Sequence, residues 1–286
     1  TDVQVFGTNP RETLLLRMNP FAFPENIHIL EHIDRLVEIF NACWPMYAAM
    51  PAVLKDAIER SYQKVGWDLR NSESEKGIFP TFFDLLDILP GVIEESHYSK
   101  DTQSDYVGAL CTRVKSLTNG IYGSVLCAED ALSDAEMFDQ NVIVDLSRVG
   151  SMETKSLLMG ILVMKLQEYR MCSSGMNSRL RHVTVLEEAH NLLRKTSAEQ
   201  SQEGANLQGK SVEMLANAIA EMRTYGEGFI IADQAPGLLD MSVIRNTNTK
   251  IILRLPDEED RKLVGKSAAL KEAQIDELSK LPLGVA

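Results

Sequence analysis

The pattern of apolar and polar residues alternates between short strand-like runs and longer helical stretches. Short apolar runs rich in β-branched residues are typical of buried strands, and apolar residues three and four positions apart are typical of helices. Strands that alternate with helices indicate a mainly parallel sheet with right-handed crossovers, so we expect an α/β fold. The expected strands are residues 13–18, 141–147, 183–186, 228–232 and 250–255.

Helices are predicted in the intervals between these strands. The helix that begins at Phe82 is expected to stop before Pro90, because proline removes a backbone donor and clashes with the preceding turn. The stretch 152–170 is apolar on nearly all sides and should be buried. The expected helices are two within residues 28–66, then 82–89, 106–117, 152–170, 212–224 and 238–244, with polar loops at 70–76 and 99–104.

The spacing of the strands predicts three segments. Residues 1–27 would begin a sheet core, residues 28–138 would form a mostly helical insertion, and residues 139–286 would hold the rest of the core. The chain opens on Thr1 and ends at 281–286 where a further strand would begin. We therefore expect a fragment of a longer protein, cut within the core at both ends.

The composition is ordinary for a globular protein, with 286 residues, 44% hydrophobic and 24% charged. A net charge of −12 excludes a generally basic nucleic-acid-binding surface, although a local basic groove stays compatible with it. No signal peptide and no apolar run of membrane-spanning length is visible, so we expect a cytoplasmic protein without membrane contact. The four scattered cysteines predict reduced thiols, not disulfides or a zinc site: Cys43, Cys111, Cys127 and Cys172.

Two adjacent carboxylates, Glu187 and Glu188, follow the expected strand 183–186 directly. In open α/β sheets, ligands bind at the carboxyl ends of strands. One acid there can hold Mg²⁺ through its water shell while the other orients or deprotonates an attacking water. The alternative is a strand that ends in solvated acids before a helix, where glutamate is also favourable. These residues alone leave both interpretations open, and no cluster with direct metal-ligand spacing is present.

A second polar pair, Asp233 and Gln234, follows the expected strand 228–232. A glutamine at that place can sense a γ-phosphate or hold water, and the alternative is a turn residue before Pro236. An arginine beside a γ-phosphate stabilises transition-state charge, often from a neighbouring subunit. Three arginines near the ends of elements are candidates, with a surface ion pair as the alternative for each: Arg223, Arg245 and Arg254.

Residues 204–211 fit the phosphate-loop pattern G-x-x-x-x-G-K-[ST] letter for letter. A working loop needs an apolar strand leading into its first glycine, and the preceding residues, 196–203, are polar instead. The favoured interpretation is therefore a connector with a helix start at Lys210 and Ser211.

Three segments together resemble the HerA/FtsK superfamily of ring-forming, DNA-translocating ATPases, especially its HerA branch. They are V-T-V-L-E-E-A-H, A-E-M-R-T-Y-G-E-G-F-I-I-A-D-Q-A-P and I-R-N-T-N-T-K-I-I-L-R-L. The upstream N-P-F, G-W-D and N-V-I-V-D-L-S segments extend the likeness over most of the chain. The resemblance implies a RecA-like P-loop NTPase sheet with a helical insertion. The whole is also similar to the ATPase part of DptH-like bacterial DNA-defence proteins.

The resemblance also implies roles for single residues. Glu187 and Glu188 match the family's Walker B acids, Gln234 its post-strand glutamine, and Arg223 the arginine of its G-R-K-x-G segment, with Arg245 as a rival. The usual first acid is aspartate, so the longer Glu187 puts the way the metal is held in doubt. The family's Walker A loop lies upstream of the N-P-F segment, and we expect it before Thr1.

Two functions from different classes follow from this resemblance. The first is part of an ATP- and Mg²⁺-dependent DNA translocase or helicase, a homo-oligomeric ring such as a hexamer that threads DNA through its pore, with a nuclease or other defence partner. The second is a non-hydrolysing scaffold that assembles with a partner protein. In either case, the chain without its phosphate loop should bind ATP weakly and turn it over poorly.

Overall fold

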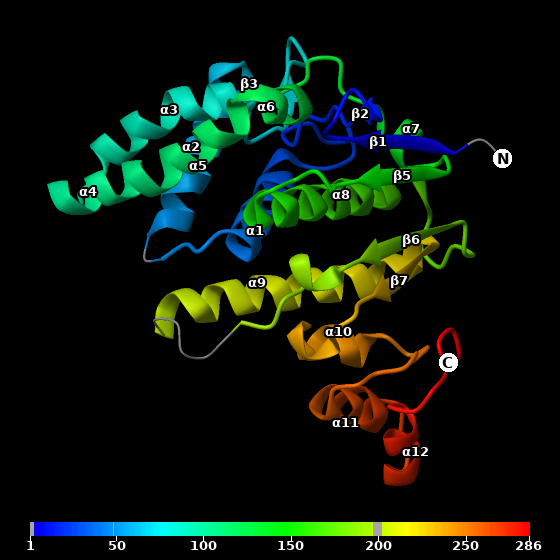
Figure 1. Ribbon diagram of the computed structural model, residues 1–286. Helices are drawn as coiled ribbons and strands as arrows, with labels where there is room; N and C mark the ends of the chain where they lie inside the picture. Colours follow the sequence, from blue (N-terminus) through cyan, green and yellow to red (C-terminus); the bar gives the residue numbers. More distant parts are fainter. Residues whose placement is uncertain (1–2, 48, 197–201) are drawn as a thin grey trace. The chain divides into compact units, whose positions relative to one another are not determined.

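The computed structural model describes residues 3–47, 49–196 and 202–286, and the side chains among them except those of residues 202–206. Contacts divide the chain into two compact units, Thr1–Gly175 and Met176–Ala286. Figure 1 labels the elements of both units. The predicted segment boundaries, after residues 27 and 138, stay predictions.

The first unit contains a three-stranded parallel sheet. Its central strand is β1 (Gln4–Gly7), which lies between β2 (Leu14–Leu15) and β5 (Val142–Asp145). The structure confirms the strand expected at 141–147. The strand expected at 13–18 is wrong in extent, because only two of its residues pair. The central strand β1 was missed, since it has only four residues and turn-forming Asn9 and Pro10 follow after Thr8.

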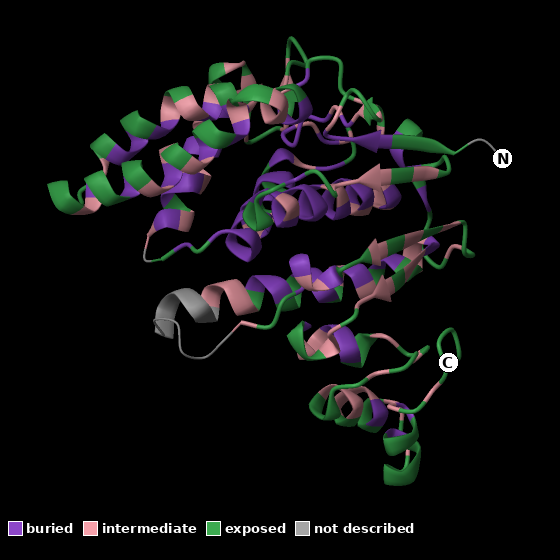
Figure 2. Cartoon of the chain, in the orientation of Figure 1, coloured by how far each residue is buried: buried purple, intermediate pink, exposed green. Residues whose placement is uncertain are grey.

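Helices α1 (Ile29–Cys43) and α8 (Met152–Ser173) pack on each other and form the core of this unit. Figure 2 shows both helices as mostly buried. Both were predicted, and α8 is buried on nearly all sides as its composition indicated. Fully buried side chains from the two helices include Ile33, Leu36, Phe40, Leu157 and Ile161.

A helical block lies between β2 and β5 in the sequence, as predicted. Trp67 and Phe79 stack next to a short antiparallel hairpin, at the place where a polar loop was expected. The block consists of α2 (Met50–Lys64), the hairpin strands β3 (Trp67–Asp68) and β4 (Glu73–Ser74), α3 (Phe82–Glu95), α4 (Lys100–Tyr106), a π-helical turn (Val107–Cys111), α5 (Thr112–Thr118), α6 (Gly120–Leu126) and α7 (Asp134–Phe138).

Two predictions within this block were wrong. Helix α3 continues through Pro90 to Glu95, because the proline lies on the exposed side while Leu89, Val92 and Ile93 are buried. Burying three such side chains stabilises the helix by several kcal/mol, at about 1.5–3 kcal/mol each, which exceeds the roughly 3 kcal/mol cost of an interior proline. The loop expected at 99–104 forms helix α4 instead, because the Ser99 hydroxyl caps its start by accepting from Thr102 N.

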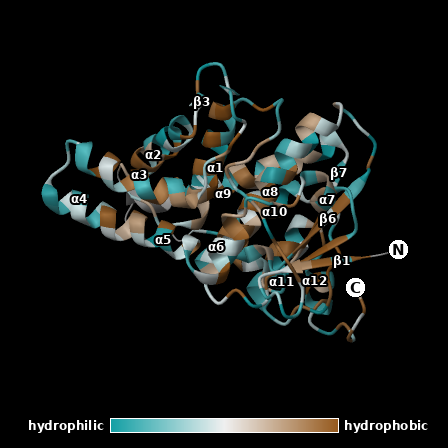
Figure 3. Ribbon diagram, turned by 90° about the horizontal axis from the view of Figure 1, so that it is seen from above, coloured by the Kyte–Doolittle hydropathy of each residue, from teal (hydrophilic) through white to brown (hydrophobic). Residues whose placement is uncertain are grey.

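The second unit is built on two parallel strands, β6 (His182–Glu187) and β7 (Glu227–Ala232), which pair along their full lengths. Both strands were predicted, and Figure 3 shows their apolar character. Helix α9 (Gln202–Glu221) lies between them in sequence and leads into a 3₁₀ helix at Met222–Tyr225. Further elements are 3₁₀ helices at Ala189–Asn191 and Pro236–Leu238, then α10 (Met241–Asn246), α11 (Glu258–Ser267) and α12 (Glu272–Glu277).

Three expectations for the second unit were wrong. Residues 250–255 form no ladder with another described strand, and Ile251 is 81% exposed. The buried strand expected at 183–186 exposes one face, with Val183 and Val185 on it. The helix expected at 238–244 is two short elements, a 3₁₀ helix and α10. The apolar runs at 183–186 and 250–255 therefore predicted extended backbone, but not which elements would cover these residues or pair with them.

The fold class is confirmed. The structure is a mixed α/β fold in which every strand pair apart from the β3–β4 hairpin is parallel, among the described residues. The parallel strands lie in two sheets, one in each unit.

Candidate functional site

The carboxyl ends of β6 and β7 bring the two predicted polar pairs to one edge. Glu187 pairs in register with Ala232, so Glu188 and Asp233 are the next residues at that edge. Glu187, Glu188 and Gln234 are exposed, whereas the Asp233 side chain is only 3% exposed. The structure thus gathers the candidate acids and the candidate glutamine within the second unit, and their roles stay predictions.

Glu188 has an unusual backbone conformation, with φ 48° and ψ 47°. This left-handed region costs a residue with a side chain about 1–2 kcal/mol. The Asn191 side-chain amide donates to Glu188 Oε2 at 3.2 Å, and the Asn191 N–H donates to the Glu188 carbonyl at 2.9 Å. The turn breaks the alternation of the strand at Glu188. Backbone strain of this kind is concentrated at functional positions.

Asp233 joins the turns that follow the two strands. One of its oxygens, Oδ2, accepts from the His190 N–H at 2.8 Å and from His190 Nδ1 at 2.9 Å. Its other oxygen, Oδ1, accepts from the Ala235 N–H at 2.9 Å. His190 lies in the 3₁₀ helix that follows β6. The link to Asp233 was missed, because residues 43 positions apart carry no local signal of contact.

The segments beyond these turns are also joined. Arg194 and Leu239 form an antiparallel bridge, and Lys195 N donates to the Leu238 carbonyl. Asp240 N donates to the Leu193 carbonyl at 2.9 Å. The chain that leaves β6 is therefore held against the chain that leaves β7 independently of Asp233.

The candidate arginines lie on three different segments. Arg223 is exposed in the 3₁₀ helix that precedes β7, at the amino end of the strand. Because β7 has six residues, its ends lie about 20 Å apart at roughly 3.3 Å per residue. Arg245 is exposed in the last turn of α10, and Arg254 is exposed in the unpaired stretch 250–255. None of these three arginines forms an ion pair with another described residue.

Two further arginines, Arg179 and Arg181, lie next to the Arg223 segment and were missed by the sequence analysis. Ser178 N donates to the Thr224 carbonyl at 3.1 Å, and Arg181 N donates to the Gly226 carbonyl at 2.8 Å. Both arginines are exposed and form no ion pair with another described residue. A chain of net charge −12 thus concentrates three unpaired guanidinium groups at the amino edge of β6 and β7.

Residues 204–211, which match the phosphate-loop pattern, lie inside helix α9. Gly204 is in the first turn of α9, but beyond that turn backbone N–H groups bond to carbonyls four residues earlier and cannot cradle a phosphate. The expected helix start at Lys210 and Ser211 is also wrong, since α9 begins at Gln202. The connector expected before Lys210 is therefore helical from Gln202 on, and residues 197–201 of the polar stretch before it lie outside the described residues.

The described residues offer neither a metal site nor an activated thiol. No group of three or more His, Cys, Asp or Glu side chains could hold a metal ion there. All four cysteines are free. Burial raises the pKa of the Cys43 thiol to about 12 and that of the Cys127 thiol to about 11, which disfavours the nucleophilic thiolate form of both.

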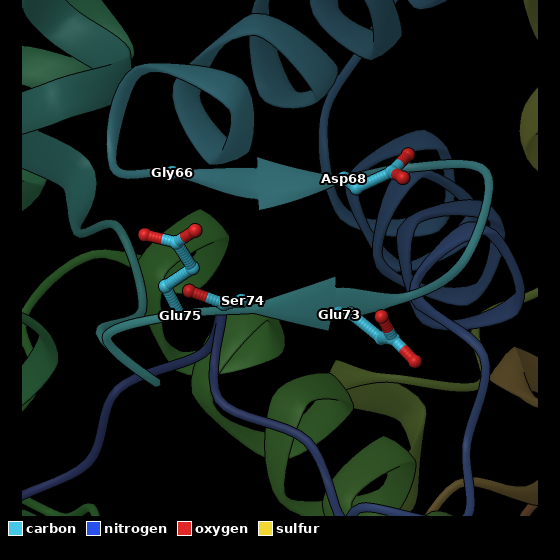
Figure 4. A pocket seen from close by; sticks show the side chains of 5 residues that line it. All are labelled: Gly66, Asp68, Glu73, Ser74 and Glu75. Atoms are coloured by element: carbon cyan, nitrogen blue, oxygen red, sulfur yellow. The ribbon is translucent and has the colours of Figure 1, made fainter.

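The hollow in Figure 4 belongs to the β3–β4 hairpin of the first unit and contains none of the candidate residues. It measures about 520 Å³ and is lined by Gly66, Asp68, Glu73, Ser74 and Glu75. Its three carboxylates make it unsuitable for a phosphate group. Over the described part of the chain, no helix is both long and apolar enough to cross a membrane.

Comparison with known proteins shows the fold. No family model and no curated protein matches the chain. VirB4 of Thermoanaerobacter pseudethanolicus matches with a TM-score of 0.67 and 18% identity, over 96% of this chain and 70% of VirB4. The bacterial conjugative coupling protein TrwB matches with a TM-score of 0.46 and 12% identity, over 92% of this chain and 55% of TrwB, which is too weak to add to the argument. The chain has the fold of VirB4, the RecA-like P-loop ATPase fold that the sequence resemblance implied.

Proposed function

We propose that this chain is part of an ATP-driven motor of the FtsK/HerA type that translocates DNA. The observation that carries the proposal is the carboxyl edge of β6 and β7, where Glu187, Glu188 and Gln234 meet on a fold shared with VirB4. Open α/β sheets bind their ligands at this edge. Acids and an amide are the groups that nucleotide hydrolysis requires there.

In this proposal, Glu187 holds Mg²⁺ through water and Glu188 orients or deprotonates the water that attacks the γ-phosphate. Both carboxylates are exposed, and carboxylate oxygens that leave room for waters suit Mg²⁺. Gln234 contacts the γ-phosphate or the water. Bound Mg-ATP would supply the phosphoryl group to be transferred, and residues 204–211, which are helical, are not proposed as its phosphate cradle.

The arginines support a shared site between subunits. Arg223 lies at the opposite end of β7 from Gln234, so it cannot reach the phosphate that its own Glu188 would face. We therefore propose a homo-oligomeric ring, such as a hexamer, in which Arg223 serves the nucleotide of a neighbour, with Arg245 as the rival. Four narrower parts of the proposal rest on the sequence alone. They are membership of the HerA branch, passage of DNA through the pore of the ring, a nuclease or defence partner, and a cytoplasmic location.

Replacing Glu188 with glutamine in the full-length protein tests the proposal. The amide keeps the shape of the side chain but loses the charge that polarises water, so ATP turnover should fall at least 100-fold while Mg-ATP binding by calorimetry changes little. Glu213→Gln is the matched control, because Glu213 is exposed on α9 and should leave turnover unchanged. Turnover of Glu188→Gln within a few-fold of wild type would show that Glu188 does not activate the water, whereas a wild-type protein without turnover would favour the non-hydrolysing scaffold.

A further inference from the structure

We propose that Asp233 and His190 form a positioning pair that fixes Glu188 relative to Gln234 across the two strand ends. The inference rests on the proposed function and assigns a role to two residues that the sequence interpretation left without one. His190 lies two residues after Glu188, and Asp233 immediately precedes Gln234. Each member of the pair therefore lies within two residues of a group proposed to face the phosphate.

The geometry gives Asp233 three donors from two turns. The His190 N–H and ring Nδ1 both donate to Oδ2, at 2.8 and 2.9 Å, and the Ala235 N–H donates to Oδ1 at 2.9 Å. A carboxylate can only accept, so the ring proton of His190 must be on Nδ1. Hydrogen bonds to a charged group are stronger and shorter than neutral ones. The pair therefore restrains the 3₁₀ helix at Ala189–Asn191 against the turn at Gln234.

Burial strengthens this restraint. The Asp233 side chain is 3% exposed and that of His190 is 24% exposed. A nearly buried carboxylate is costly unless its hydrogen bonds are made, so any displacement of one turn that breaks these bonds is penalised. Glu188, held in the left-handed conformation, lies directly between β6 and the restrained residue. The pair thus keeps a strained glutamate in one orientation.

A purely cohesive role is less consistent with the contacts. The two chain segments already hold each other through the Arg194–Leu239 bridge and the bond from Asp240 N to the Leu193 carbonyl. Asp233 adds its bonds at the end nearest Glu188 and Gln234. Its effect is therefore expected on the alignment of the two side chains more than on whether the segments associate.

Steady-state kinetics of the full-length protein tests the inference with two variants of His190. His190→Ala removes the ring donor, and kcat for ATP should fall about 10- to 100-fold, because misplacing a reacting group by about 1 Å costs that much. KM and Mg-ATP binding should stay within about two-fold, since neither residue is proposed to touch the nucleotide. His190→Asn places an amide N–H where Nδ1 donates, and it should restore kcat to within about three-fold of wild type.

Asp233→Asn provides the reciprocal test. Asparagine has a single acceptor oxygen, so it cannot serve Ala235 and both His190 donors, and its amide hydrogens would face donors. Its kcat should fall as in His190→Ala. The kcat of the double variant should be no lower than that of the more impaired single variant, because both substitutions break the same restraint. Thermal unfolding of each variant checks that the chain still folds.

The outcomes separate this inference from the proposed function. If the wild type hydrolyses ATP and His190→Ala has the same kcat, the positioning role is overturned and the motor proposal stays intact. A fall in kcat that His190→Asn does not restore, or additive losses in the double variant, would also overturn it. A wild-type protein that does not hydrolyse ATP would reject the proposed function itself, and the positioning role in turnover with it.

Discussion

At the scale of single residues, the backbone of Glu188 distinguishes it from Glu187. Its positive φ costs free energy and belongs to the turn that leads from β6 into the 3₁₀ helix. Neighbouring Glu187 is the last residue of β6 and has extended backbone. Two adjacent glutamates therefore have different backbone conformations, so that replacement by glycine should change the stability of the protein differently at the two positions.

We predict that Glu188→Gly is more stable than Glu187→Gly by about 1 kcal/mol or more in urea unfolding. Glycine adopts the left-handed region without a steric penalty, whereas glycine inside a strand is destabilising by about 0.5–1 kcal/mol. Equal losses for the two variants would show that Glu188 is not left-handed in solution. ATP turnover should be lost in Glu188→Gly even so, because the carboxylate is gone.

At the scale of elements, helices α1 and α8 are joined by a buried polar cluster. Glu168 on α8 accepts from His32 Nδ1 at 2.9 Å and from Arg35 Nη1 at 3.2 Å, and both Glu168 and His32 have fully buried side chains. The ring of Tyr62 from α2 lies beside His32. Burial alone would raise the pKa of Glu168, but the charges and hydrogen bonds of His32 and Arg35 hold that pKa below its ordinary value of 4.5.

This cluster predicts acid lability. A carboxylate whose pKa is lower in the folded chain contributes stability that is complete above the unfolded pKa and is lost as the pH falls through the folded pKa. We expect the urea concentration at which half of the wild type is unfolded to decrease as the pH is lowered below about 4.5. Glu168→Gln should be less stable at pH 6.5 and should show a flatter profile between pH 5 and pH 3. Parallel profiles for the two proteins would remove Glu168 as the cause.

At the scale of the whole molecule, the two ends of β7 carry different halves of the proposed chemistry. Glu188 and Gln234 lie at the carboxyl end and Arg223 at the amino end. One subunit cannot bring these groups to a single phosphate, because the length of the strand separates them. A complete site would need two copies of the chain.

Mixing two inactive variants of the full-length protein tests this arrangement. Arg223→Ala should reduce turnover by about 10³-fold, as the loss of an arginine that acts in trans does. Arg223→Ala subunits mixed with Glu188→Gln subunits should recover part of the activity, since some mixed interfaces contain both intact groups. Arg70→Ala is the control, because Arg70 is an exposed arginine in the first unit. Mixed rings that form but stay inactive would rule out the trans role of Arg223.

Much of the architecture follows from local patterns. Strands β5, β6 and β7 and helices α1, α2 and α8 could be predicted, because short β-branched runs, helical spacing of apolar residues and a long apolar stretch are all features of neighbours along the chain. The meeting of Glu187, Glu188 and Gln234 at one edge could also be predicted. It requires only that two parallel strands end where their polar residues begin.

Tertiary structure decided what depends on residues far apart. The passage of α3 through Pro90 depends on what buries its other face, and the lack of pairing at 250–255 depends on which strands are neighbours. The helical state of residues 204–211 overrides a pattern of letters that is typical of a loop. The Asp233–His190 pair and the left-handed Glu188 arise where the ends of two strands meet in space. Local sequence sets which conformations are accessible, but long-range burial and hydrogen bonding select among them, because those energies exist only once the partners are in place.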